Sequence, residues 1–203
     1  MRRRNWIAGL AAVGLLPKRG FADTTPRLKV VLNKSNPRES SGLLKGEKFA
    51  VGFGKHGFKS EGSAFEGGYS LLGTFRVNAI LTRETFAMTD SLVQQSGKSR
   101  EWLEEKLFTN MSSIDFDGDG KGGEYGDAFI GLEPVDTSVQ QPFHFGEYKG
   151  VFRWYSYAIH GTQDESRIGK CITGGCINVG QKDLLELVEI VKLGDLVEIT
   201  QPD

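Results

Sequence analysis

The sequence predicts a mainly β fold with short helices, in which a mixed sheet or β-sandwich carries a capping insertion. Two observations support this fold class. Glycine is abundant, at 27 of 203 residues, which favours a loop-rich fold over a helical bundle. Short segments rich in β-branched and aromatic residues recur along the chain, whereas only two segments space their nonpolar residues as a helix does. The length suits a single domain, with or without a large insertion.

The predicted strands are short and fall into two groups, one before and one after the middle of the chain. They cover residues 27–32, 48–54, 73–81, 151–161 and 195–200. Alternation in the third of these places Phe75, Val77 and Ala79 on one face. In the fourth it places Ala158 and His160 on one face, so that His160 lies at the end of its strand.

Two segments have the nonpolar spacing of helices. Residues 99–108 form the first. Residues 183–194 form the second, with a nonpolar stripe that includes Leu184 and Leu187 and with Gly194 as a suitable C-terminal stop. Residues 82–150 are predicted to form the insertion, within a domain that covers residues 23–203.

The N-terminus has the layout of a secretory signal peptide over residues 1–22. Three arginines precede a nonpolar run from Trp6 to Leu16, and small residues at Gly20 and Ala22 suit cleavage before Asp23. The run is too short for a membrane span, which needs about 20 residues. We expect export to the periplasm or cell envelope, with the twin-arginine route as one candidate path and with no stable membrane anchor afterwards. The alternative is a cytosolic protein with a nonpolar N-terminus.

The charge of the mature chain argues against nucleic-acid binding. The signal segment holds five basic residues and no acidic ones, so the remainder has 20 basic and 26 acidic residues, a net charge of −6. An acidic surface is unsuited to nonspecific contacts with phosphate.

Residues 157–180 contain both cysteines of the chain and His160. A cysteine becomes a good nucleophile when a histidine or another positive field favours its thiolate, and acyl transfer also needs donors for the oxyanion. Gly174 and Gly175 before Cys176 allow a sharp turn that could gather backbone amides. The residues alone also permit a buried structural cysteine, a disulfide between Cys171 and Cys176, or a zinc site that adds His160.

The same segment resembles the catalytic signature of the L,D-transpeptidase (YkuD-type) family. The matching motifs are HGT at 160–162 and TGGCIN at 173–178, and YSLLGTFRV at 69–77 resembles an earlier strand of the family. The resemblance implies that Cys176 is the nucleophile and His160 its base. It further implies that Gly161 positions the ring, that the amides of Gly174, Gly175 and Cys176 form the oxyanion hole, and that Thr173 and Asn178 hold the loop. Gly174 stands where the family signature has a second histidine.

The resemblance implies a cysteine acyltransferase acting on peptidoglycan stem peptides, with no required cofactor. With water as acceptor, the same chemistry would make an L,D-carboxypeptidase or amidase. The rival is a non-catalytic module that binds calcium or the cell wall. If Cys176 is the nucleophile, a disulfide would consume it, so we expect Cys171 to be a buried free thiol.

A Gly- and Asp-rich loop at residues 115–127 begins like a calcium loop. Its candidate Ca²⁺ ligands are Asp115, Asp117, Asp119, the carbonyl of Lys121, and Glu124, with Asp127 nearby. Gly126 stands where such a loop has its bidentate Glu, and a solvated turn-rich loop is the alternative.

Overall fold

The computed structural model describes residues 25–60, 68–112, 123–135, 143–145, 148–150 and 157–202. The predicted signal peptide, residues 115–122 of the predicted calcium loop, and residues 151–156 of the predicted strand lie outside these ranges. Within them, no helix is both long and apolar enough to cross a membrane.

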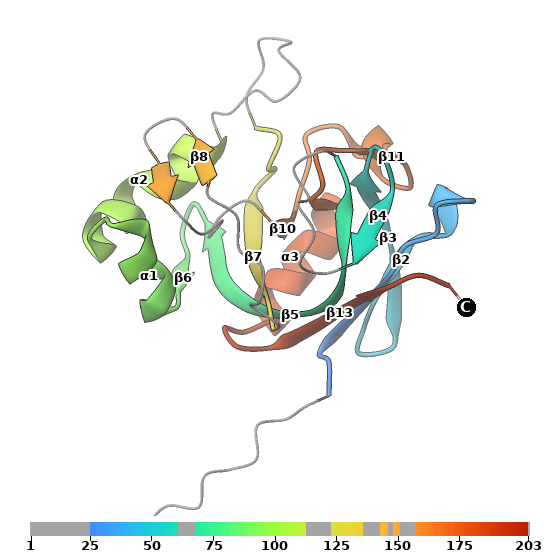
Figure 1. Ribbon diagram of the computed structural model, residues 1–203, viewed down its shortest axis with the longest axis horizontal. Coiled ribbons are helices and arrows are strands. Elements are labelled where there is room, and N and C mark those ends of the chain that lie inside the picture. Colours follow the sequence, from blue (N-terminus) through green and yellow to red (C-terminus); the bar gives the residue numbers. More distant parts are fainter. Residues whose placement is uncertain are drawn as a thin grey trace, which may run out of the picture.

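Eight strands form a mixed sheet that closes on itself (Figure 1). Their order is β3-β12-β10-β7-β5-β13-β1-β2, and β2 also pairs with β3. The prediction of a mainly β mixed sheet with short helices is confirmed, and the closure makes the sheet a barrel. The barrel strands are β1 (Leu28–Val31), β2 (Ser41–Leu44), β3 (Glu47–Gly54), β5 (Ser70–Thr82), β7 (Ala128–Pro134), β10 (Ala158–His160), β12 (Ile177–Val179) and β13 (Leu196–Thr200).

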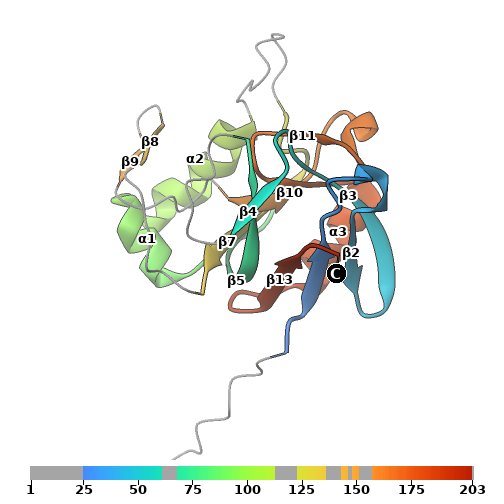
Figure 2. The same cartoon turned by 45° about the vertical axis from the view of Figure 1, so that its right-hand side comes forward.

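The other elements surround this barrel. Short strands extend it at β3 and β5, and a separate hairpin forms from β8 and β9. Helices α1 and α2 lie together on one side (Figures 1 and 2). These elements are β4 (Phe58–Ser60), β6 (Phe86–Met88), β8 (Phe143–Phe145), β9 (Tyr148–Gly150), β11 (Cys171–Thr173), α1 (Asp90–Ser96), α2 (Arg100–Ser112), α3 (Gln181–Ile190), and the 3₁₀ turns Pro37–Glu39 and Glu165–Arg167.

Strand β7 lies inside the segment 82–150 that the sequence predicts to be an insertion. It pairs with β5 on one side and with β10 on the other, so it belongs to the barrel. Among the described residues of that segment, β6, α1, α2 and the β8–β9 hairpin lie outside the eight-stranded barrel.

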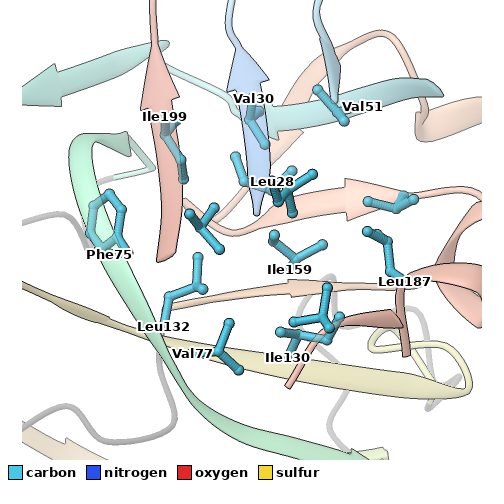
Figure 3. Packing of buried hydrophobic residues seen from close by; sticks show 14 of the residues in the cluster. Leu28, Val30, Val51, Phe75, Val77, Ile130, Leu132, Ile159, Leu187 and Ile199 are labelled. Carbon is cyan, nitrogen blue, oxygen red and sulfur yellow. The ribbon is translucent and has the colours of Figure 1, made fainter. Parts of the chain in front are cut away.

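The main hydrophobic cluster, here called the interior cluster, fills the closed sheet (Figure 3). Leu184 and Leu187 of α3 pack into it, as the predicted stripe requires. On β10, Ile159 belongs to this cluster, so the neighbouring Ala158 and His160 face the opposite side of the sheet. Labelled members are Leu28, Val30, Val51, Phe75, Val77, Ile130, Leu132, Ile159, Leu187 and Ile199.

A second cluster, here called the outer cluster, covers the other face of the sheet where α1 and α2 pack. Leu92 of α1 and Leu103 and Leu107 of α2 are fully buried in it. Its residues are Ala79, Leu81, Met88, Leu92, Leu103, Leu107, Phe108, Tyr125, Phe129 and Ala158. Because β10 contributes Ala158 to this cluster, the site described below lies on the side that the helices cover.

Two sequence predictions about side-chain placement and helix length are wrong. Ala79 does not share a face with Phe75 and Val77, because the β5–β7 register shifts between Val77 and Ala79 and moves Ala79 to the outer cluster. The second predicted helix ends at Ile190 and does not continue to Gly194. Val191 turns to extended backbone, and its side chain is buried in the interior cluster.

Candidate active site

His160 is the last residue of β10 and is held between two strands of the barrel. It aligns with Phe129 of β7 and with Asn178 of β12. Only 6% of the residue is exposed. Its ring contacts the ring of Tyr125, with 4.6 Å between the centroids. The barrel register therefore carries His160 to the face of the outer cluster and leaves its ring little freedom.

Hydrogen bonds determine which ring nitrogen of His160 can accept a proton. Nδ1 lies 2.7 Å from the carbonyl oxygen of Gly161. A carbonyl only accepts, so Nδ1 carries the proton and Nε2 has the free lone pair. The side-chain nitrogen of Asn178 lies 3.2 Å from the same Nδ1 and donates to the Gly161 carbonyl, its nearer acceptor, at 3.0 Å. The Gly161 carbonyl thus positions the ring, and Asn178 fixes that carbonyl from the neighbouring strand.

Burial keeps this imidazole neutral. The pKa of His160 is lowered to about 4, mainly by desolvation and to a smaller extent by nearby Arg167, and the backbone hydrogen bond with Gly161 opposes both effects. A neutral imidazole with a free Nε2 is the form that can act as a general base.

The end of the predicted calcium loop packs directly against His160. Tyr125 is 95% buried and contacts both His160 and Phe129. Beside Tyr125, two segments of the backbone approach closely, because a Cβ on Gly126 would lie 2.7 Å from the Cα of Gly161. Sequence reasoning missed Tyr125, although the glycine that follows it permits a close approach of the backbone.

Cys176 directly precedes β12. Ile177 aligns with Ile159, so the register places Cys176 beside Ala158 and diagonally from His160 on the same face, a relation that side chains can bridge. Cys176 is half-buried and packs against the outer cluster. Burial raises the pKa of its thiol to about 12, although a backbone hydrogen bond with Ala158 opposes the rise. The resting pair is therefore a neutral thiol and a neutral imidazole.

The turn before Cys176 is tied by the hydroxyl of Thr173. The Thr173 hydroxyl donates to the Cys176 carbonyl at 2.6 Å and accepts from the Gly175 amide at 3.1 Å. The Gly175 N–H is therefore already bound, which corrects the prediction that it serves the oxyanion hole. The roles of the Gly174 and Cys176 amides in the oxyanion hole stay a prediction.

The two glycines of this turn differ in conformation and surroundings. Gly175 has a φ of 141°, a region that favours glycine. Gly174 is exposed, and a Cβ built on it would meet no atom within 4 Å. The turn therefore requires glycine at the second position, whereas the first has room for the histidine of the family signature.

Cys171 lies on a different side of the sheet from Cys176. It packs against the interior cluster, whereas Cys176 packs against the outer cluster. Neither cysteine is in a disulfide, as we expected for Cys171. The expectation that Cys171 is buried is wrong, because this residue is only half-buried. Among the described residues, no three His, Cys, Asp or Glu side chains gather as a metal site, so the zinc alternative of Cys171, Cys176 and His160 is not formed.

The calcium site stays a prediction. Asp115, Asp117, Asp119 and Lys121 lie outside the described residues, and Glu124 is half-buried at the edge of the described part. The carboxylate of Asp127 accepts a hydrogen bond from the side-chain amide of Gln181 at 2.5 Å, which ties the end of this loop to α3.

With this geometry in place, a family model decides the identity of the domain. Residues 17–199 match the model of the L,D-transpeptidase catalytic domain, YkuD. The chain belongs to this family. The L,D-transpeptidase catalytic domain is an enzyme domain, and the match covers the segments that contain His160 and Cys176.

Curated relatives and solved structures include further L,D-transpeptidases. The YkuD proteins of Bacillus licheniformis and Bacillus subtilis, both named as L,D-transpeptidases, are similar to the chain. They are 45% and 40% identical over 56 and 57 residues, which is 28% of this chain in each case. The matches span 34% and 35% of those proteins, about a third of their length.

Among solved structures, the chain is similar to L,D-transpeptidase 3 from Mycobacterium tuberculosis in complex with a faropenem-derived adduct. That match has 13% identity and a TM-score of 0.44, and it covers 86% of this chain and 60% of the other. An L,D-transpeptidase from Mycobacterium smegmatis matches with 12% identity and a TM-score of 0.41, covering 86% of this chain and 58% of that one.

Proposed function

We propose that this L,D-transpeptidase domain is an exported cysteine acyltransferase that acts on peptidoglycan stem peptides. The observation that carries the proposal is the placement of Cys176 and His160 on one face of neighbouring strands, with His160 Nε2 left as the basic nitrogen. Membership of the family supports peptidoglycan peptides as the substrate class.

Each residue of the pair has a defined task in this reaction. As the Sγ of Cys176 attacks the scissile carbonyl carbon, the thiol proton passes to Nε2 of His160 and a C–S bond forms. The carbonyl oxygen becomes an oxyanion, which backbone amides stabilise. When the tetrahedral intermediate collapses, the C–N bond breaks and the imidazolium returns the proton to the leaving amine. An acyl-enzyme on Cys176 remains.

The neutral resting pair suits this sequence of steps. Because the pKa of Cys176 is raised and that of His160 is lowered, a preformed thiolate–imidazolium pair is disfavoured in the free protein. Proton transfer therefore accompanies attack on the substrate. A neutral thiol also protects Cys176 from oxidation in the cell envelope, since the thiolate is the reactive form.

The acceptor decides the product. A second stem peptide that offers an amine gives a cross-link, and water gives an L,D-carboxypeptidase or amidase product. The outcome depends on how the pocket admits the acceptor and not on the fold.

Incubation of the mature protein with muropeptides, followed by mass spectrometry, tests the proposal. We expect release of the terminal residue of the donor peptide together with a cross-linked or hydrolysed product, and neither with Cys176→Ala. An unchanged muropeptide profile with the wild type would favour the non-catalytic module, and full turnover by Cys176→Ala would remove Cys176 as the nucleophile.

Export is part of this proposal, because peptidoglycan lies in the cell envelope. The arginine-led nonpolar N-terminus supports it. N-terminal sequencing of the protein recovered from the envelope fraction should begin at Asp23. Recovery of full-length protein from the cytosol would contradict export.

Calcium binding by the Gly- and Asp-rich loop is a second, separate proposal. The spacing of Asp115, Asp117 and Asp119 supports it. Calcium should raise the Tm of the mature protein, and Asp117→Ala should remove this gain, because a ligand that binds only the folded state stabilises it. Identical melting curves with calcium and with a chelator would contradict it.

A further inference from the structure

The peptide bond that precedes the nucleophile is anchored by a side chain far away in the sequence. Ser70, the first residue of β5, donates from Oγ to the Gly175 carbonyl oxygen at 2.7 Å across a separation of 105 residues. The same Oγ accepts from the Gly54 amide at 2.9 Å. Ser70 has no exposed surface, so neither bond competes with water.

The backbone around Ser70 is shaped to bring β3 close to it. A Cβ on Gly54 would lie 2.6 Å from the Ser70 nitrogen and 2.6 Å from the Gly68 carbonyl oxygen. Only glycine therefore allows the Gly54 amide to reach Ser70 Oγ. With its acceptor role filled by β3, the Ser70 hydroxyl directs its hydrogen at Gly175.

Anchoring the Gly175 carbonyl also orients the Cys176 amide. The two groups belong to one planar trans peptide, in which C=O and N–H point in opposite directions, and the described backbone contains no cis peptide bond. The Cys176 N–H is therefore directed away from Ser70. Without the anchor, glycine at position 175 would leave this peptide plane free to rotate.

The direction of the Cys176 amide matters because of where the oxyanion forms. The new C–S bond holds the reacting carbonyl carbon at Sγ of Cys176, so the oxygen develops beside the amide of the same residue. We propose that Ser70 is a positioning residue that orients the Gly175–Cys176 peptide and thereby forms the oxyanion hole. This inference rests on the proposed role of Cys176 as the nucleophile.

Two reactions of the same thiol separate this role from a general structural one. Acylation by p-nitrophenyl acetate passes through an oxyanion, whereas alkylation by iodoacetamide is a displacement at a saturated carbon and forms none. With the Cys176→Ala background subtracted, Ser70→Ala should slow acylation at least about tenfold, below the 10²–10³-fold cost of deleting an oxyanion-hole donor outright. Alkylation should be unchanged.

Ser40→Ala is the matched control. Ser40 is 99% buried, and its Oγ also joins two backbone groups, accepting from the Asn33 amide at 2.8 Å and donating to the Asn33 carbonyl at 3.5 Å. Losing this hydroxyl should leave the ratio of acylation to alkylation at the wild-type value. Ser70→Thr keeps a γ-hydroxyl and should restore the ratio. If Ser70→Ala does not fold, Ser70→Thr and Ser70→Val repeat the test with side chains of equal shape.

The outcomes separate the inference from the proposed function. A wild-type ratio in Ser70→Ala, or in Ser70→Val where that variant replaces it, or an equal loss of both reactions, would overturn the role of Ser70 and leave Cys176 as the nucleophile. Acylation of the wild type no faster than that of Cys176→Ala would overturn the proposed function itself.

Discussion

The two halves of the site are held in different ways. The His160 half is part of the barrel, where the pairing of β10 with β7 and β12 places the residue, and the Gly161 carbonyl, Asn178 and the Tyr125 ring orient its imidazole. The Cys176 half is a turn, where the hydroxyls of Ser70 and Thr173 bind successive peptide groups. The pairing of strands thus determines the position of the imidazole. The direction of the backbone amides in the turn depends instead on side-chain hydroxyls that bind its peptide groups.

This difference predicts how each half responds to substitution. In the histidine half, removing the ring removes a chemical function and leaves the strand pairing intact. In the cysteine half, a substitution that contacts no substrate can still slow the reaction, because the proposed donors to the oxyanion are backbone amides whose direction depends on the turn.

The largest expected effect among the following tests is in the histidine half. His160→Ala should lower acyl transfer about 10²–10⁴-fold, the usual contribution of a general base. His56→Ala is the control, because His56 is exposed and lies outside the matching motifs. Muropeptide turnover measures both, and equal activity of the two variants would show that His160 is not the base.

The lowered pKa of His160 also makes the histidine half sensitive to acid. Between pH 6.5 and about 4 the unfolded chain protonates this imidazole while the folded protein does not, so the free energy of unfolding falls as the pH drops through this window. The full loss is on the order of 3 kcal/mol. Urea unfolding of wild type and His160→Gln at several pH values measures it.

The wild type should lose more stability than His160→Gln over this range, since glutamine does not titrate. Parallel curves for wild type and His160→Gln would mean that the folded protein protonates the ring at the same pH as the unfolded chain does, which would contradict the lowered pKa.

The paired glycines test the cysteine half. Gly175→Ala should cost about 1–3 kcal/mol of stability, because alanine at a φ of 141° is strained. Gly174→Ala should change stability by no more than about 0.5 kcal/mol, since its Cβ meets nothing within 4 Å. Gly174→His should be tolerated for the same reason. Thermal melts compare the three, and equal costs at both positions would contradict the strained turn.

The smallest expected effect concerns Cys171. Cys171→Ser should leave acyl transfer unchanged and insensitive to reductant, as in the wild type, because neither cysteine is in a disulfide and the two pack on different sides of the sheet. Activity with and without reductant measures it. Activation of the wild type, but not of Cys171→Ser, would instead reveal an inhibitory disulfide.

Local patterns predicted the parts of the fold that depend on local physics. β-Branched and aromatic composition identified β1, β3 and β13, because such side chains favour extended backbone, and a nonpolar stripe identified α3, because burial of one helix face repeats with the helical period. Alternation failed at Ala79, where a register shift moves the residue to the other face. Composition failed at β7, whose place in the barrel depends on two partner strands and not on its own residues.

The candidate site divides along the same line. The sequence of residues 157–180 indicated His160, Cys176 and the glycine pair as candidate site residues, since a nucleophile, a base and a flexible turn can be recognised within a short segment. Tertiary structure alone added Tyr125 against the imidazole and Ser70 beneath the turn, and it showed that the Gly175 amide is already bound. The physical reason is that a hydrogen bond or a ring contact depends on distance and direction in space. A chain that closes into a barrel joins residues 105 positions apart without any trace in the sequence between them.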